Sequence, residues 1–106
     1  MNKVKQQKNK NNQLMINRLG VILKEERITN RALAASIGYE EATVSKWATN
    51  AIQPPVSTFF RIALIINRDL KDFFVSTNQI EESDKKKYLK TLAEIAEKAK
   101  RTGKNK

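Results

Sequence analysis

Apolar residues along most of this chain recur every three or four positions, the spacing that places them on one face of an α-helix. The pattern predicts helices over about residues 14–27, 30–37, 40–49, 56–66, 70–74 and 83–100. No segment shows the sustained alternation of apolar and polar residues that a half-buried strand requires. The sequence therefore predicts an all-α fold, with a core of five helices and one further helix appended at its C-terminal side.

Capping and breaking residues mark several helix ends. Thr29 and Asp69 offer N-cap oxygens to the second and fifth helices, and Gly38 suits the turn after the second helix because glycine adopts positive φ without strain. Pro54 and Pro55 interrupt the pattern before the fourth helix. That helix is apolar around much of its circumference, which predicts a central helix of the core.

The chain divides into five segments by composition. Residues 1–13 are rich in Lys, Asn and Gln and are expected to form a disordered basic arm. The folded domain is expected at residues 14–75, followed by a polar linker at 76–82. An amphipathic C-terminal helix (83–100) and a basic tail (101–106) complete the chain.

The net charge of +10 is concentrated towards the two ends of the chain. Residues 1–13 and 79–106 each carry +4, whereas residues 14–78 carry only +2. This distribution favours a polyanionic partner, either nucleic acid or an anionic membrane surface. Solubilising charge without a partner is the alternative that composition alone leaves open.

The residue inventory argues against catalysis. The chain has no Cys and no His, so disulfides, thiol nucleophiles, Cys/His zinc sites and histidine acid–base chemistry are all absent. No nucleophile has a base beside it, and we expect no catalytic residue, metal or cofactor. No apolar run approaches the roughly 18 residues that span a bilayer, so we expect a cytoplasmic, nucleoid-associated protein that does not use a membrane.

Four residues have the spacing of a helix-turn-helix. Ala34, Gly38, Val44 and Trp47 stand four, six and three residues apart. A helix-turn-helix needs a small residue where its two helices cross, a Gly in the turn, and apolar residues on the inner face of its second helix. The outward positions of the predicted third helix are short or polar, which suits the edges of bases in a major groove.

These residues resemble the Cro and phage-repressor (Xre-like) family of helix-turn-helix regulators. The resemblance covers about residues 16–75. It rests on Thr29-Asn30, Leu33-Ala34, Ile37-Gly38, Thr43-Val44-Ser45-Lys46-Trp47, Thr49-Asn50, Gln53-Pro54 and the stretch from Phe59 to Phe74. It implies a protein that places its recognition helix, about residues 40–49, in the major groove of double-stranded DNA.

The resemblance also implies a role for each site residue. Glu41 and Ala42 match base-reading positions, and Thr43, Ser45 and Lys46 face the groove or the backbone. The residues that match phosphate-contacting or loop positions are Asn30, Thr49, Asn50 and Gln53. Arg31 is either a further phosphate contact or an ordinary solvated charge. Glu41 either accepts a hydrogen bond from cytosine N4 or only favours the helix N-terminus electrostatically.

Trp47 is expected to be a core residue and not a DNA contact. Two other positions depart from the family pattern. The position that caps the recognition helix holds Glu40 in place of Ser, Thr or Asp. Ala48 stands where many relatives have Glu, so an ion pair made there is expected to be missing.

The resemblance implies a repressor or autoregulator that binds a palindromic operator as a homodimer. The apolar stripe of the C-terminal helix is expected to fold back on the core, to pair with a second copy or to engage another protein. An antitoxin-type protein, which binds DNA and a partner protein through its C-terminal segment, is therefore an alternative. A nonspecific polyanion or membrane-surface binder is a second one.

Overall fold

The computed structural model describes residues 14–102, with side chains as far as Lys100. Its helical elements are α1 (Leu19–Glu25), α2 (Asn30–Ile37), α3 (Glu41–Ala48), α4 (Val56–Ile66), the 3₁₀ helices η1 (Leu70–Phe73) and η2 (Thr77–Gln79), and α5 (Glu82–Thr102). The described residues form no β-sheet, so the all-α prediction is confirmed. The predicted basic arm (1–13) lies outside the described residues.

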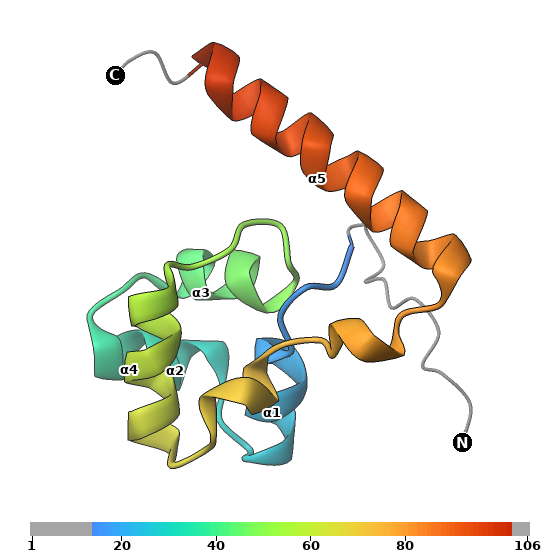
Figure 1. The fold of residues 1–106 in the computed structure, drawn as a ribbon. Coiled ribbons are helices and arrows are strands. Elements are labelled where there is room, and N and C mark those ends of the chain that lie inside the picture. The colour runs from blue at the N-terminus through green and yellow to red at the C-terminus, as the bar shows by residue number, and fades with distance from the viewer. Residues whose placement is uncertain (1–13, 103–106) are drawn as a thin grey trace. The chain divides into compact units, whose positions relative to one another are not determined.

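The described chain belongs to two compact units, one ending at Val75 and one beginning at Ser76. Figure 1 shows α1 to α4 grouped around the centre of the first unit. Aromatic side chains contribute to this core, and Phe59 of α4 meets Phe74 edge-on with ring centroids 4.8 Å apart. The residues buried in the core are Leu19, Ile22, Leu23, Leu33, Ala34, Ile37, Val44, Trp47, Phe59, Ile62, Ala63 and Phe73.

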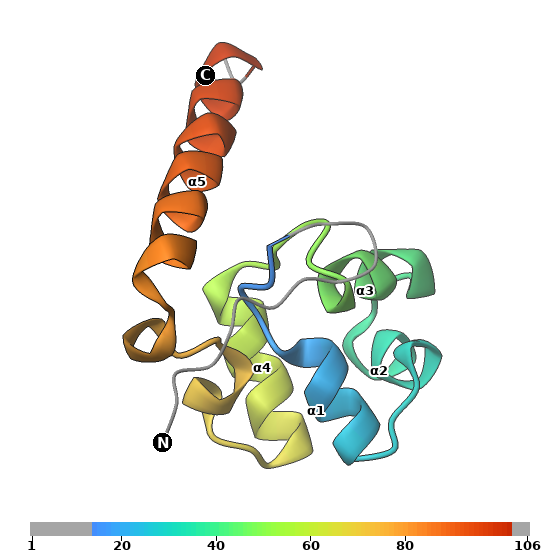
Figure 2. The ribbon, with the colours of Figure 1, turned by 90° about the vertical axis from the view of Figure 1, so that its right-hand side faces the viewer.

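The first helix begins five residues later than the sequence predicts. Asn17 is fully buried, and its side-chain Oδ1 accepts the backbone N–H of Leu19 at 2.9 Å. This local bond competes with helix formation. Residues 16–18 instead run beside the segment that follows α4, with the Arg18 N–H donating to Phe73 O and the Val75 N–H donating to Ile16 O. Figure 2 shows this strand-like approach to α1.

The same helix also ends earlier than predicted, at Glu25 instead of Arg27. Arg27 has a φ of 59°, a left-handed conformation that terminates the helix. The N–H of Ile28 then donates to Leu23 O at 2.8 Å, and the N–H of Arg27 donates to Lys24 O at 3.2 Å. These two bonds form a Schellman motif, which usually has a glycine at the position that Arg27 holds here. Because that glycine is missing, the sequence did not predict this helix end.

One ion-pair cluster joins the end of α1 to the segment after α4. The guanidinium of Arg68 lies 2.9 Å from a carboxylate oxygen of Glu26 and 3.2 Å from one of Glu25. Its Nε also lies 3.5 Å from a carboxylate oxygen of Asp72 in η1. Because these carboxylates are a third to a half exposed, solvent screens each pair, and the cluster mainly fixes the two segments in register.

The fourth helix is only half buried, which corrects the expectation of a central helix. Its inner face, formed by Thr58, Phe59, Ile62 and Ala63, is buried in the core. Its outer face exposes large apolar side chains at Val56, Phe60, Leu64 and Ile65. A helix that is apolar all round is normally buried all round, so the outer face of α4 is apolar surface that this unit leaves in solvent.

The remaining elements differ from prediction in detail. The predicted fifth helix is the 3₁₀ helix η1, and Asp69 caps it as expected, its carboxylate accepting the N–H of Lys71. The predicted linker contains η2. In the second unit, α5 starts one residue before and ends two residues after the predicted range. The side chains of Leu89, Leu92 and Ile95 are exposed on it.

Candidate nucleic-acid interface

The helix-turn-helix begins with a capped α2. Thr29 adopts an extended conformation, and its hydroxyl oxygen accepts the backbone N–H of Ala32 at 3.0 Å. At the other end, Gly38 has a φ of 80° and lets the chain turn away from the helix. An L-residue in that conformation is strained. Both local predictions are confirmed, and together they set the length of α2 at eight residues.

The inner face of α3 fixes its orientation on α2. Val44 and Trp47 are buried, as the spacing predicted, and Ala34 on α2 is buried opposite them. Tyr39, in the turn, places its ring edge-on to Trp47 with centroids 4.8 Å apart. An edge-to-face pair of this kind adds about 0.5–1.5 kcal/mol to the burial of the two rings. The buried side of α3 is therefore fixed to the core by large apolar contacts.

The outer face of α3 presents short and charged side chains. Glu41, Ala42 and Lys46 are exposed, while Thr43 and Ser45 are half-buried at its edges. Glu40 occupies the N-cap position in an extended conformation, without a side-chain capping bond. The exposed carboxylate of Glu41 thus lies in the first turn, where the helix dipole favours negative charge.

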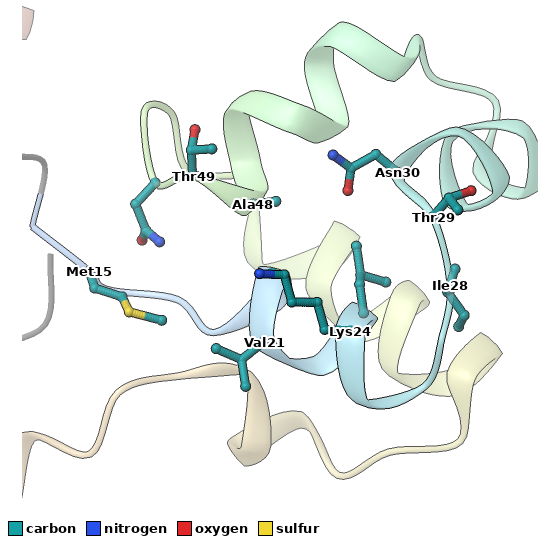
Figure 3. A pocket seen from close by; sticks show the side chains of 11 residues that line it. Met15, Val21, Lys24, Ile28, Thr29, Asn30, Ala48 and Thr49 are labelled. Carbon is teal, nitrogen blue, oxygen red and sulfur yellow. The ribbon is translucent and has the colours of Figure 1, made fainter. Parts of the chain in front are cut away.

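A hollow of about 440 Å³ lies between α1, the start of α2 and the end of α3. Figure 3 shows Lys24, Asn30 and Thr49 around it, together with the apolar side chains of Met15, Val21 and Ile28. Lys24 and Asn30 bring donors to this hollow. The Thr49 hydroxyl donates to backbone carbonyls of its own helix, at 3.1 Å from Ser45 O and 3.3 Å from Lys46 O.

The side chain of Asn50 faces inward, where it joins an amide network. Asn50 is 8% exposed, and its Oδ1 accepts the backbone N–H groups of Ile16 at 2.8 Å and Asn17 at 2.9 Å. Its Nδ2 donates to the carbonyl oxygen of Asn17 at 3.0 Å. The residue that the family pattern assigns to the phosphate-gripping loop therefore has an internal role here.

Asn17 and Gln53 complete that network. The Asn17 side-chain amide donates to Trp47 O at 3.1 Å and to Gln53 Oε1 at 2.7 Å. Gln53 in turn donates from Nε2 to Asn50 Oδ1 at 3.1 Å. The carbonyl of Trp47 also accepts the backbone N–H of Asn50 at 3.1 Å, so the Asn17 amide is its second donor. The network thus adds a hydrogen bond at the end of α3 and ties it to the segment before α1.

A close backbone approach fixes the same end of α3 against α1. A Cβ atom added at Gly20 would lie 2.9 Å from the carbonyl oxygen of Ala48, which is too close for a normal contact. Glycine in a helix interior is otherwise unfavourable by roughly 0.5–1 kcal/mol relative to Ala. Glycine at this position allows the backbone of α1 to approach the backbone at the end of α3 closely.

The structure thus separates the predicted site residues into three groups. Glu41, Ala42, Thr43, Ser45 and Lys46 share the outward side of α3, with exposed Arg31 on the neighbouring helix. Asn30 and Thr49 both line the hollow. Asn50 and Gln53 belong to the amide network. Asn17 was not predicted as a structural residue. The sequence shows it only as a single amide side chain within the largely apolar stretch from Leu14 to Leu23.

Within residues 14–102, no helix is both long enough and apolar enough to cross a membrane. The same part of the chain contains no cluster of acidic residues suited to hold a metal ion.

Among solved structures, this chain is similar to a bacterial protein of known structure. The crystal structure of a protein from Bacteroides fragilis, to which DNA binding has been ascribed, matches with a TM-score of 0.56 and 35% sequence identity. The match covers 58% of this chain and the whole of the other chain. This chain belongs to the same family. The rest of the chain has no counterpart in that structure. No family model and no curated protein matches the sequence.

Proposed function

We propose that this protein is a sequence-specific, double-stranded DNA-binding transcriptional regulator of the Cro and phage-repressor (Xre-like) type. The observation that carries the proposal is the division of α3: Val44 and Trp47 are buried against the core, while Ala42, Ser45 and Lys46 face outward. A helix supported in this way can enter the major groove without losing its own packing. The family member from Bacteroides fragilis, with its ascribed DNA binding, supports the same function.

The proposed interface distinguishes base-reading residues from backbone contacts. Glu41, Ala42, Thr43 and Ser45 read base edges, since they stand on the exposed side and at the edges of α3. Lys46, at the exposed side of the helix end, pairs with a phosphate. Asn30, Arg31 and Thr49 make the other backbone contacts that set the register of the helix along the groove. The Thr49 hydroxyl must rotate away from its helix carbonyls to donate to a phosphate oxygen.

Asn50 and Gln53 contribute to DNA binding indirectly, because they position the end of α3. Their amides hold the end of α3, so the phosphate contact of Thr49 depends on them indirectly. Any direct contact from this loop uses exposed groups of Gln53 or the backbone, because both ends of the Asn50 amide are engaged.

The protein acts as a repressor or autoregulator that binds a palindromic operator as a homodimer. One recognition helix reads only a short half-site, and a two-fold symmetric pair doubles the sequence that is read. The mildly basic core, +2 over residues 14–78, gives a modest salt-dependent affinity on its own. Specificity must then come from the base contacts of two copies.

Selection of bound duplexes from a random pool, with the full chain as bait, tests this function. A palindromic consensus with half-sites about one helical turn apart is the expected result. The matched variant Glu41→Gln is expected to change the preferred base at one position in each half-site. If the selection enriches no consensus and every duplex binds equally well, the protein is a nonspecific polyanion binder.

The exposed apolar side chains of α5 favour one alternative, an antitoxin-type protein that also neutralises a partner protein. Leu89, Leu92 and Ile95 are between 40% and 60% exposed on that helix. The double substitution Leu92→Glu with Ile95→Glu is then expected to abolish co-purification of a second small protein while leaving DNA binding unchanged. If no second protein co-purifies with the unaltered chain, this alternative is excluded.

A further inference from the structure

The outer face of α4 carries an apolar stripe with an unusual arrangement. Val56, Phe60 and Leu64 follow one another at intervals of four residues and are 68%, 55% and 69% exposed. Residues four apart lie on one ridge of a helix, so the three side chains form a continuous row about 12 Å long. Ile52, which is half exposed, precedes the row in sequence. Contiguous apolar patches on a surface often mark interaction sites.

We infer that this α4 row, Val56, Phe60 and Leu64, is the surface through which two copies of the chain associate. The inference rests on the proposed DNA-binding function and names the interface that function requires. A two-fold axis passing beside Phe60 places the row of one copy antiparallel to the row of the other. Phe60 then meets the partner's Phe60, and Val56 meets the partner's Leu64.

The symmetry of the row is the argument for a second copy as its occupant. Val56 and Leu64 are equidistant from Phe60 along the helix, so the row is complementary to itself under a two-fold rotation, as an isologous interface must be. Rows of residues four apart also interdigitate in the commonest mode of helix packing. An aromatic side chain at the centre, bordered by aliphatic ones, is typical of the residues that dominate binding energy.

Charge is absent from the row and lies beside it. Arg61 is the nearest ionic side chain on the helix, and its Nη1 donates to the carbonyl oxygen of Ile37 on α2 at 3.1 Å. The guanidinium is thus directed towards α2 and does not interrupt the row. Ile65, 50% exposed, lies beyond Arg61 on the other flank of α4 and falls outside the proposed interface.

The size of the row predicts a weak dimer. A stable interface usually buries about 1,200–2,000 Å² in total. Three side chains on one pair of helices fall short of that range, and two chains of charge +10 repel one another. The dimer is therefore expected at micromolar concentration and to be reinforced on palindromic DNA. Salt is expected to strengthen it by screening the repulsion, whereas salt weakens DNA binding.

Two matched pairs of variants test the interface. Phe60→Glu is expected to raise the dimer dissociation constant at least tenfold in analytical ultracentrifugation, while Ile65→Glu, on the same helix and similarly exposed, leaves it unchanged. The natural chain has no Cys. Phe60→Cys is therefore expected to give a covalent dimer with a short thiol-specific cross-linker, and Ile65→Cys is not. Thermal unfolding of each variant verifies that the domain remains folded.

The outcomes separate this inference from the proposed function. If both Glu variants dimerise like the unaltered chain, or if that chain is monomeric both free and on its selected palindrome, the α4 interface is wrong even though DNA binding stands. A chain that dimerises through Phe60 but selects no DNA consensus would retain the interface and refute the function. Loss of stability in Phe60→Glu without any change in association would show that the row is covered within one chain.

Discussion

The side-chain amide of Asn50 pairs with the backbone of Asn17 as a neighbouring strand would. Its Oδ1 accepts the Asn17 N–H at 2.9 Å, and its Nδ2 donates to the Asn17 carbonyl oxygen at 3.0 Å. The two residues are 33 positions apart in sequence. Because Asn17 also donates to Trp47 O, this pairing connects the end of α3 to the segment before α1.

Replacing Asn50 with Ala is expected to lower the free energy of unfolding by about 2–4 kcal/mol, because it leaves the buried N–H and C=O of Asn17 without partners. Chemical denaturation monitored by circular dichroism measures the change. Asn67→Ala is the matched control, since Asn67 has nearly the same φ, 66° against 65°, but an exposed side chain. Equal losses in the two variants would show that backbone strain, not the network, accounts for the effect.

Gly20→Ala is expected to destabilise the protein by about 1–3 kcal/mol, since the added methyl group meets the backbone carbonyl of Ala48. The sign is informative, because Gly→Ala inside a helix normally stabilises by about 0.5–1 kcal/mol. We also expect weaker DNA binding from the displaced end of α3. Calorimetric melting and a binding titration measure the two effects. A variant that melts higher than the natural protein would contradict the close approach.

Arg27→Gly is expected to stabilise the protein by about 1 kcal/mol. Arg27 is exposed and holds a left-handed conformation that costs an L-residue roughly 1–2 kcal/mol, and Gly adopts it without that cost but with greater flexibility when unfolded. Arg27→Ala keeps the strain and serves as the control for loss of the side chain. A melting temperature that rises for Gly and not for Ala is the expected pattern; a fall for Gly would refute it.

Lys46→Ala is expected to weaken binding to all DNA sequences alike and to make the dependence of log K on log salt less steep by about one. The reason is that a phosphate contact releases one counterion but reads no base. Fluorescence anisotropy at several salt concentrations measures both quantities. Lys71→Ala, which removes the same charge from η1, is expected to change neither. A consensus that shifts in Lys46→Ala would assign this residue to base reading instead.

The helix-turn-helix itself was predictable because its determinants are local. Thr29, Gly38, Val44 and Trp47 each act within a few residues of their own position, through a cap, a turn conformation or the inner face of one helix. The spacing of apolar, capping and glycine residues along the sequence predicts such local features directly. The division of α3 into a buried and an exposed side therefore follows from the sequence.

Other features depended on partners that are remote in sequence. Asn17 ends the extended segment before α1 because of Asn50 and Gln53, which the apolar pattern does not connect to it. Arg27 ends α1 in a left-handed conformation, which an arginine rarely adopts and which the sequence therefore did not predict. The apolar character of α4 was visible, but hydrophobicity alone does not say whether a side chain is covered by its own domain or by another chain.

Trp47 is the chain's single tryptophan, and it is buried in the last turn of α3 with its ring against that of Tyr39. Its intrinsic fluorescence therefore comes from one position only, beneath the surface that is proposed to meet DNA. Every substitution considered above leaves that fluorophore in place. Trp47 fluorescence can therefore show, for each variant, whether α3 is still packed on the core. A loss of DNA binding can then be separated from a loss of packing.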